Sequence, residues 1–400
     1  MTRQAFTGAR LLGQTVPVEA EILLCCARVC VDSQTVARCR RLLQEDVNWE
    51  RLITLAQRHA LTPLLYWQLR HFDNASVPVS HLTDLRNSFQ QNAVRNLLLA
   101  QELVAIRRSF EARGIGSIPY KGPALAVLAY GNLSLRCFID LDIIVRRKDV
   151  GVARSILSAG GYSPHLSLTE SQQAAMIRTH HGMAFSHADK KIILELHWDV
   201  AGKRFSSQYD PEGVWRRLTT VRLGDSTLEI MSVEDTLLSL CVHGSRHLWG
   251  RLAWVCDVAE LVAKHEQMDW ERISAQAKMS GSWRMLAVGL LLALELFEAP
   301  LPLSIKEKVI ADDTVRRLAA RIAVDSFRES VRPPTLSHTF SYNLHVRERL
   351  SDRLAYFCFM LSPTDADLAA VSLPTGMGFL YYLLRPIRMI YRVGRASATH

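Results

Sequence analysis

The sequence predicts an α+β protein in which a strand-rich segment lies between two helical regions. From residue 19 to about 103, apolar residues recur at three- and four-residue steps, the spacing of a helix with one buried face. Between residues 114 and 199 the pattern changes to short alternating runs around one helix-like stretch, and from Ser232 onward the helical spacing returns. Strands interleaved with helices indicate an α/β or α+β unit, and the helical flanks lead us to the α+β class.

Composition indicates an ordinary globular protein. The chain has 400 residues, of which 48% are apolar and 22% charged, so we expect two or three packed units and exclude disorder over the whole length. Its eight cysteines form no C-x-x-C pair, which argues against a zinc ribbon and favours free thiols in a reducing cytoplasm. We find no secretory signal pattern and expect a cytoplasmic protein. The net charge of +9 favours anionic partners such as nucleotides, nucleic acid or acidic membrane.

Capping residues and composition shifts predict where the elements and regions begin. Asp46 or Asn48 can cap a helix that starts near Trp49, and Pro63 opens the next helix. Ser232, followed three residues later by an aspartate, has the spacing of a capping box. We divide the chain into an N-terminal helical region (1–100), a core (101–205), a helical domain (206–330) and a C-terminal helical extension (331–400).

The most informative stretch begins with a turn into a helix. Gly122 is predicted at the N-cap, Pro123 at the first helical position and Gly131 at the helix end. The backbone N–H groups of such a first turn, with the helix dipole and Lys121 alongside, can bind a phosphate chain.

Two carboxylates follow on a predicted strand. Residues two apart share one face of a strand, so Asp140 and Asp142 point the same way, about 7 Å apart at Cα. Placing two like charges on so apolar a strand is costly unless a cation neutralises them, which suggests Mg²⁺. The competing interpretation, favoured for an isolated Asp-x-Asp, is that one aspartate begins the strand in solvent and the other faces an arginine.

A second strand repeats this arrangement and makes the metal interpretation stronger. In the run KKIILELHWDV, Glu195 lies on the polar face as a third carboxylate, and His197 can orient it by hydrogen bonding. Arg136 lies four residues before the first aspartate. Three acidic groups, a phosphate-binding turn and basic residues are what two-metal phosphoryl or nucleotidyl transfer requires.

These motifs resemble a known superfamily. The order Lys-Gly-x-Ala-Leu, Tyr-Gly, Arg-x-x-x-Asp-x-Asp and then Glu-Leu-His-Trp is similar to the nucleotidyltransferases that include DNA polymerase β. It resembles in particular a bacterial group of uncharacterised nucleotidyltransferases and, more distantly, the nucleotidyltransferase toxins of abortive-infection systems. The resemblance implies a polymerase β-like core, a small mixed sheet with helices, in which Asp140 and Asp142 are metal ligands, Glu195 is the third carboxylate and Gly122 lies against the triphosphate.

One position departs from the superfamily pattern. Gly-Gly or Gly-Ser is usual at the turn, whereas here Pro123 follows the glycine and removes one amide donor and one hydroxyl. Lys121 and Arg136 are therefore expected to carry more of the phosphate binding.

Other segments point less clearly to a function. His243, His247 and Arg251 recur at four-residue intervals, which predicts a polar helix face toward the nucleotide cleft or packing against a tryptophan rather than a zinc site. For the histidines at 180, 181 and 187 we expect ordinary structural roles. Residues 379–395 combine aromatic and arginine residues, typical of a helix at a membrane surface or docked on its own domain; docking is preferred. We find no motif for reading nucleic acid.

We therefore expect a cytoplasmic nucleotidyltransferase that uses two Mg²⁺ ions. It would transfer a nucleoside monophosphate from an NTP such as ATP to an unidentified acceptor hydroxyl or phosphate and release pyrophosphate. The main alternative is a non-catalytic nucleotide-binding accessory protein of a biosynthetic or toxin–antitoxin type system. A metal-dependent glycosyltransferase also uses Asp-x-Asp, but Glu195 and the lysine-glycine turn disfavour it.

Overall fold

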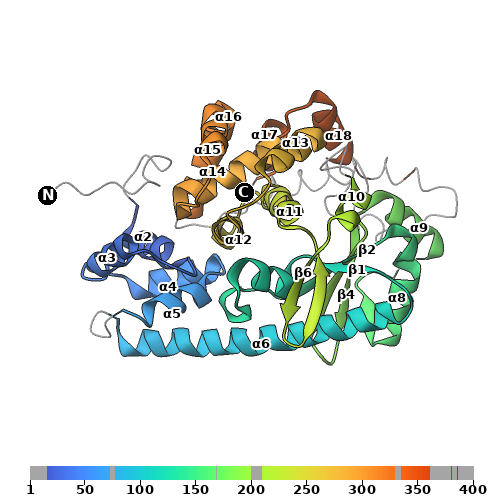
Figure 1. The fold of residues 1–400 in the computed structure, drawn as a ribbon, viewed down its shortest axis with the longest axis horizontal. Coiled ribbons are helices and arrows are strands. Elements are labelled where there is room, and N and C mark those ends of the chain that lie inside the picture. The colour runs from blue at the N-terminus through green and yellow to red at the C-terminus, as the bar shows by residue number, and fades with distance from the viewer. Residues whose placement is uncertain are drawn as a thin grey trace, which may run out of the picture.

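A computed structural model confirms the α+β class, with many helices around a small mixed sheet (Figure 1). It describes residues 16–72, 77–167, 169–199, 210–328 and 335–360, together with the single positions 380 and 385. The segment 379–395, apart from these two positions, lies outside the described residues.

The N-terminal region is helical, as predicted. Asn48 Oδ1 accepts a hydrogen bond from the N–H of Arg51 at 3.0 Å and so caps α4, while Pro63 lies in the first turn of α5. The long helix α6 runs beneath both the N-terminal helices and the sheet (Figure 1), and it crosses residue 100, where we place a region boundary. The helices are α2 (Val18–Cys26), α3 (Ser33–Leu42), α4 (Trp49–Arg58), α5 (Thr62–Leu69) and α6 (Val79–Glu111).

Five short strands form the central sheet in the order β1-β2-β5-β4-β3. Strands β2 and β5 are parallel, and all other neighbours are antiparallel, so the sheet is mixed. A hairpin joins β4 to β5 through a turn at residues 188–191. The strands are β1 (Ser117–Pro119), β2 (Asp140–Val145), β3 (Tyr162–Pro164), β4 (Gly182–His187) and β5 (Ile192–His197). A separate two-stranded sheet pairs β6 (Thr219–Leu223) with β7 (Ser226–Ile230).

Short helices connect the strands of the sheet. Gly131 ends the predicted helix after the phosphate-binding turn by adopting a left-handed conformation (φ 69°), which costs glycine little because it has no Cβ. That helix starts as α7 (Gly122–Leu125) and continues as a π-helical turn, η2 (Ala126–Tyr130). The other connections are η3 (Leu133–Leu135), η4 (Arg147–Asp149), α8 (Val150–Ala159), α9 (Glu170–Thr179) and α10 (Pro211–Arg216).

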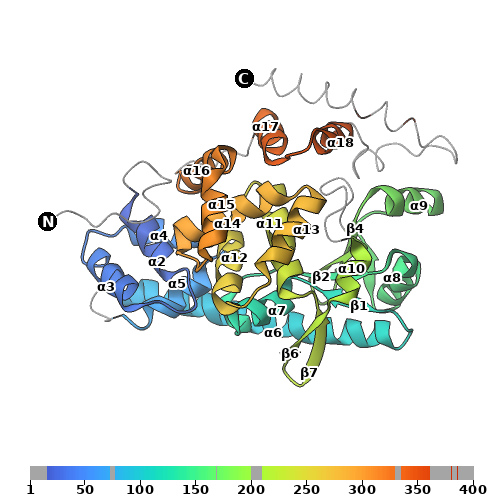
Figure 2. The ribbon, with the colours of Figure 1, turned by 45° about the horizontal axis from the view of Figure 1, so that its top comes forward.

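The C-terminal region packs as a second helical layer beside the sheet (Figure 2). Ser232 Oγ accepts a hydrogen bond from the N–H of Asp235 at 3.2 Å, which confirms the predicted cap of α11. Trp249 is 1% exposed and lies in the main hydrophobic core. The helices are α11 (Val233–Arg246), α12 (Leu252–Lys264), α13 (Trp270–Ser280), α14 (Trp283–Phe297), α15 (Leu303–Ala311), α16 (Asp313–Ser326), α17 (Leu336–Val346) and α18 (Leu350–Met360).

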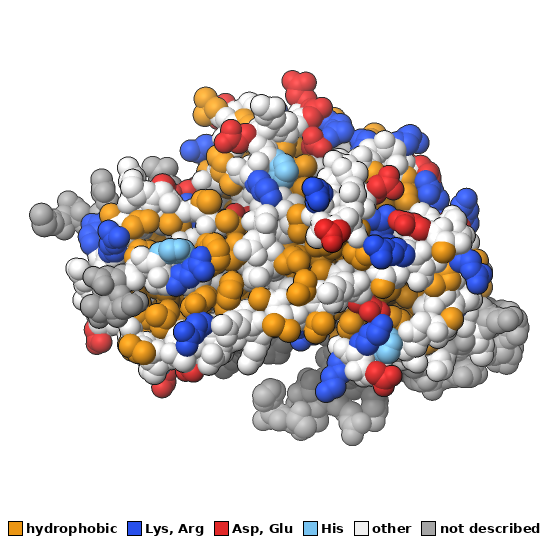
Figure 3. All heavy atoms as spheres, turned by 60° about the horizontal axis from the view of Figure 1, so that its bottom comes forward, with side chains coloured by type: hydrophobic (Ala, Val, Ile, Leu, Met, Phe, Trp, Pro, Cys, Tyr) orange, Lys and Arg blue, Asp and Glu red, His pale blue; other side chains and the backbone are white. Residues whose placement is uncertain are grey.

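Apolar and basic side chains share the molecular surface. Figure 3 shows hydrophobic side chains spread among lysines and arginines on one face, and α6 exposes Val94, Leu97 and Leu98. All eight cysteines are free thiols. Within the described part of the chain, no helix has the length and apolarity needed to cross a membrane.

Candidate active site

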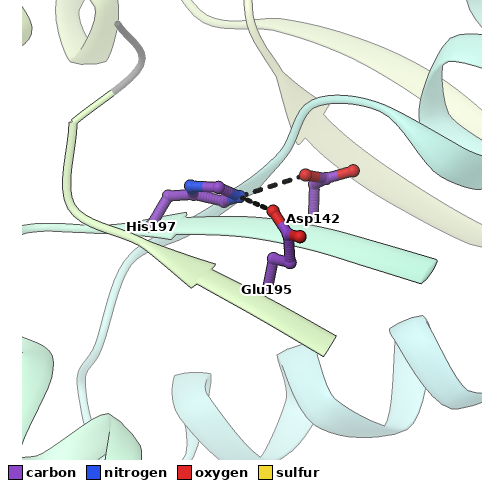
Figure 4. A group of neighbouring side chains, drawn as sticks. All are labelled: Asp142, Glu195 and His197. Carbon is purple, nitrogen blue, oxygen red and sulfur yellow. Dashed lines mark hydrogen bonds and ion pairs between the residues drawn. The ribbon is translucent and has the colours of Figure 1, made fainter. Parts of the chain in front are cut away.

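The parallel pair β2 and β5 brings two of the predicted carboxylates together. Asp142 on β2 is the register partner of Glu195 on β5. One ligand atom from each of Asp142, Glu195 and His197 lies within 4.8 Å of the others, and Figure 4 shows the three side chains converging above the two strands. The alternation of side chains along each strand selects this face, because the intervening residues Leu194 and Leu196 are fully buried on the other.

Two cationic or hydrogen-bonding groups meet a single oxygen of Asp142. Lys121 Nζ and His197 Nε2 each lie 3.0 Å from Asp142 Oδ1. His197 Nε2 also lies 3.3 Å from Glu195 Oε2. A carboxylate can only accept, so Nε2 carries the proton and donates between the two acids. The imidazole thus joins Asp142 and Glu195 (Figure 4).

These contacts keep the carboxylates ionised. Burial alone would raise the pKa of Asp142, but the Lys121 charge and the His197 hydrogen bond outweigh it and hold that pKa well below its usual range. The hydrogen bond from His197 likewise lowers the pKa of Glu195. Burial would lower the pKa of Lys121, yet the Asp142 carboxylate raises it above its ordinary value. At neutral pH Asp142 and Glu195 are therefore carboxylates, and Lys121 carries an ammonium group.

Asp140 stands at the edge of this group. It begins β2 and is half-buried, and it makes no hydrogen bond or ion pair with the residues the structure describes. Burial, and then the negative charge of Asp142, raise the pKa of Asp140. The structure therefore places Asp140 on the predicted face and in the same cleft, but outside the closest three-residue cluster.

The turn before the helix lies against the first aspartate. Lys121 rather than Gly122 occupies the N-cap, and Gly122 is the first helical residue, with φ +50°. A Cβ at position 122 would lie 3.3 Å from the Asp140 carbonyl oxygen. Glycine is therefore favoured twice, by its left-handed backbone and by the close approach of β2. The Lys121 ammonium is held 4.7 Å from the Tyr120 ring centroid, a cation–π distance.

Arg136 is held by a buried acid that the sequence did not single out as its partner. Its Nε and Nη2 donate to the two oxygens of Asp257 at 2.8 and 3.0 Å, and the Tyr130 hydroxyl donates to Asp257 Oδ1 at 2.7 Å. Burial would lower the pKa of Arg136, and the Asp257 carboxylate raises it. Arg136 Nη1 is buried and has no hydrogen-bond partner among the described residues. Arg136 thus lines the same cleft as the acids while its main ion pair is with α12.

A second layer fixes the imidazole of His197. Gly182 on β4 is its register partner, and a Cβ there would lie only 2.6 Å from His197 Nδ1. The ring of His181 stacks on that of His197 with centroids 5.9 Å apart, and the Tyr120 ring meets its edge at 5.4 Å. His181, for which the sequence predicted only a structural role, therefore lies in the site, because the hairpin brings residue 181 next to the end of β5.

A cleft of about 650 Å³ opens over these groups. Its walls come from the sheet, from α6 and from helices α4, α5, α11 and α12. This volume is in the usual range for small-molecule sites. The residues that line it include every member of the predicted site: Lys121, Gly122, Arg136, Asp140, Asp142, Glu195 and His197.

The predicted helix face carrying His243, His247 and Arg251 is interrupted, because α11 ends at Arg246 and α12 begins at Leu252. Only His243 is helical, and the other two residues lie on the turn between the helices, yet all three reach the cleft, together with Trp254. His243 packs against the edge of the Trp254 ring with centroids 5.4 Å apart, and His247 lies 5.4 Å from the same ring. The two histidines therefore both line the cleft and pack on a tryptophan, although they do not share one helix face. The three-residue cluster on β2 and β5 does not include them.

The arrangement fits a divalent cation. Two ionised carboxylates from neighbouring strands supply the oxygen ligands that hard cations prefer. His197 can orient them through its Nε2–H, or act as a ligand itself once Nε2 has lost that proton. The adjacent cations Lys121 and Arg136 suit an anionic substrate beside the metal. The geometry can thus bind a metal and a phosphate group in one place.

Comparison with known proteins agrees with this chemistry. No curated protein matches the chain. Residues 45–298, more than half of the sequence and the whole span from α4 to α14, match the model of a family described as uncharacterised nucleotidyltransferase. The chain therefore belongs to this uncharacterised nucleotidyltransferase family.

Proposed function

We propose that the protein is a metal-dependent nucleotidyltransferase with a polymerase β-like core, and that Asp142, Glu195 and Asp140 bind two Mg²⁺ ions. The observation that carries the proposal is the convergence of donor atoms from Asp142, Glu195 and His197 within 4.8 Å, in a cleft that also holds Lys121. Membership of the family supports the reaction class. When bound, the cations would neutralise the carboxylates and the developing charge on the nucleotide phosphates.

The side chains suggest how the reaction would be divided among them. An acceptor oxygen attacks the α-phosphorus of the NTP, the bond from that phosphorus to the bridging oxygen breaks, and pyrophosphate leaves. Glu195, whose side chain is 43% exposed and whose pKa is lowered by His197, is ionised and accessible, so it can take the acceptor's proton. Lys121 can bind the phosphates, and the buried Arg136 guanidinium supplies further positive charge beside them.

Labelled nucleotides test this proposal directly. The full chain would be incubated with Mg²⁺, each α-³²P-labelled NTP and a cell extract, and both pyrophosphate release and transfer of label would be measured. Wild-type protein should transfer label, and Asp142→Asn should lose about 10²- to 10³-fold in rate, in line with the loss of a principal electrostatic group. Asp189→Asn, which changes an exposed turn residue outside the cleft, is the matched control.

Two results would count against the proposal that this protein is an enzyme. If wild-type protein transfers no more label than Asp142→Asn, the catalytic proposal is wrong. If nucleotide still binds to both proteins without transfer, the accessory-protein alternative becomes the better account. The close ion pairs that Lys121 and Arg136 already make would then explain a site that binds nucleotide weakly and does not turn over.

A further inference from the structure

A second, larger cavity lies directly beside the proposed catalytic cleft. Its volume is about 1110 Å³, and it is formed by the end of α4, by one side of α16 along its length, by α17 and by the turn between α11 and α12. His247 and Arg251 line both this cavity and the cleft. The two spaces are thus neighbours that share one wall.

The lining of this cavity is strongly basic. Among the described residues that line it, five arginines face a single carboxylate, Asp325, and the arginines are Arg58, Arg251, Arg317, Arg321 and Arg328. Three histidines add further sites for hydrogen bonding. An excess of like charges in one concave space is unfavourable unless an anion enters it.

The local contacts leave most of this charge uncompensated. Asp325 lies 3.0 Å from Arg328 and 3.8 Å from Arg321. Arg317 donates to the Thr314 hydroxyl at 3.4 Å, and neither it nor Arg251 forms an ion pair with a carboxylate of the described residues. Arg317 and Arg321 are one helical turn apart on α16, so their guanidinium groups can meet one ligand together.

The cavity is built on a rigid frame. His59 is fully buried and joins three elements: its Nδ1 accepts from the N–H of Leu252 at 3.1 Å, and its Nε2 donates to the carbonyl of Ser326 at 2.9 Å. Beside it, Arg58 Nη1 donates to the carbonyl of Arg328 at 2.7 Å. These bonds fix the ends of α4 and α16 to the start of α12, which holds Arg58 and Arg251 in place.

We infer that this basic cavity binds the acceptor, and that the acceptor is a small molecule carrying a phosphate group. Guanidinium groups bind phosphate through paired hydrogen bonds, and the volume suits a small molecule. Arg251, on the shared wall, is where such a molecule would pass from the cavity to the cleft. This inference rests on the proposed nucleotidyl transfer, and it assigns the acceptor end of that reaction to helices α16 and α17, which lie beyond the family match.

Phosphate binding tests the cavity without any turnover. Metal-free full-length protein would be dialysed against ³³P-labelled inorganic phosphate in EDTA. We expect Arg317→Gln combined with Arg321→Gln to weaken binding at least tenfold. The control combines Lys306→Gln with Lys308→Gln, which removes two equally exposed charges from α15, outside the cavity, and should bind like wild type. Equal binding by all three proteins, or none by wild type, would overturn the inference.

A transfer experiment identifies the ligand's source. Cell extract would be divided by ultrafiltration and supplied to the enzyme with labelled ATP and Mg²⁺. Label should enter the small-molecule fraction. Treating that fraction with phosphatase before the reaction should abolish the transfer of label. The double arginine variant should raise the KM for the fraction at least tenfold, and Arg317→Lys with Arg321→Lys should restore much of the activity. Label found only in the macromolecular fraction would contradict a small acceptor.

The failure of this inference can be told apart from failure of the proposed function. Binding of a fluorescent ATP analogue with Mn²⁺ should be unchanged in the double arginine variant and lost in Asp142→Asn. If the analogue binds and label is transferred equally well with and without the arginines, only the cavity assignment fails. If wild-type protein neither binds the analogue nor transfers label, the nucleotidyltransferase proposal fails first.

Discussion

Gly182→Ala adds a single methyl group that should displace the His197 ring and so weaken metal binding. Gly182 faces His197 across β4 and β5, and a Cβ at this position would lie 2.6 Å from His197 Nδ1 and 3.1 Å from the Leu196 carbonyl oxygen. Ordinary contacts begin near 3.4 Å, so the ring would have to move by about 0.8 Å. It cannot slide straight back, because Nε2 already lies 3.0 Å from Asp142 Oδ1.

The expected result is a loss of both metal affinity and stability, of similar size in free energy. Disturbing a group that orients metal ligands typically costs about 10- to 100-fold in affinity, and overpacking costs about 1–3 kcal/mol in the free energy of unfolding. Mn²⁺ binding would be measured by calorimetry, and stability by chemical denaturation. The control is Gly151→Ala in α8, where a Cβ would meet nothing within 4 Å and helix propensity predicts a gain of about 0.5–1 kcal/mol.

A clear outcome would refute this reasoning. If Gly182→Ala is folded and binds Mn²⁺ as tightly as wild type, the position of the His197 ring does not govern the site. If Gly182→Ala is too unstable to measure, His197→Gln provides the same comparison without a clash, and it should also weaken Mn²⁺ binding about 10- to 100-fold.

Three further predictions concern stability, each measured by chemical denaturation. Burial lowers the pKa of His59 to about 4 from 6.5, so the neutral, buried imidazole favours the folded state fully above pH 6.5, and this stability is lost as pH falls toward 4. About 1 kcal/mol should be lost by pH 5.5, and His59→Gln should show a correspondingly smaller pH dependence. Asp257→Asn leaves Arg136 buried without its partner and should cost about 3–5 kcal/mol, whereas Asp225→Asn in an exposed turn should cost almost nothing. Ser232→Ala removes the cap of α11 and should cost about 0.5–2 kcal/mol, while Ser232→Thr should retain most of the stability.

Local patterns predicted the strands of the site well. The alternation in β2 and β5 correctly assigned Asp142, Glu195 and His197 to one polar face, because the side-chain direction in a strand depends only on residue parity. The cap at Ser232 was predicted, and Asn48 was one of the two caps considered for α4, for the same reason: an N-cap involves residues only three positions apart.

Long-range partners were beyond such patterns. Arg136 was predicted to face phosphate, yet its ion pair joins it to Asp257, 121 positions away in the sequence. The stacking of His181 on His197 likewise depends on how the hairpin closes. No local signal encodes such contacts. The ion pair forms only when α12 packs beside the sheet, and the ring stacking forms only when the hairpin closes.

The sequence by itself therefore determined the chemistry that is available: a lysine-glycine turn, carboxylates on two strands and a histidine beside them. Only the tertiary structure decided which of these groups meet. The parallel register that sets Asp142 opposite Glu195, and the packing of α16 that gathers arginines beside the cleft, follow from burying apolar faces over the whole chain. That burial is a global free-energy balance, so it cannot be read from neighbouring residues.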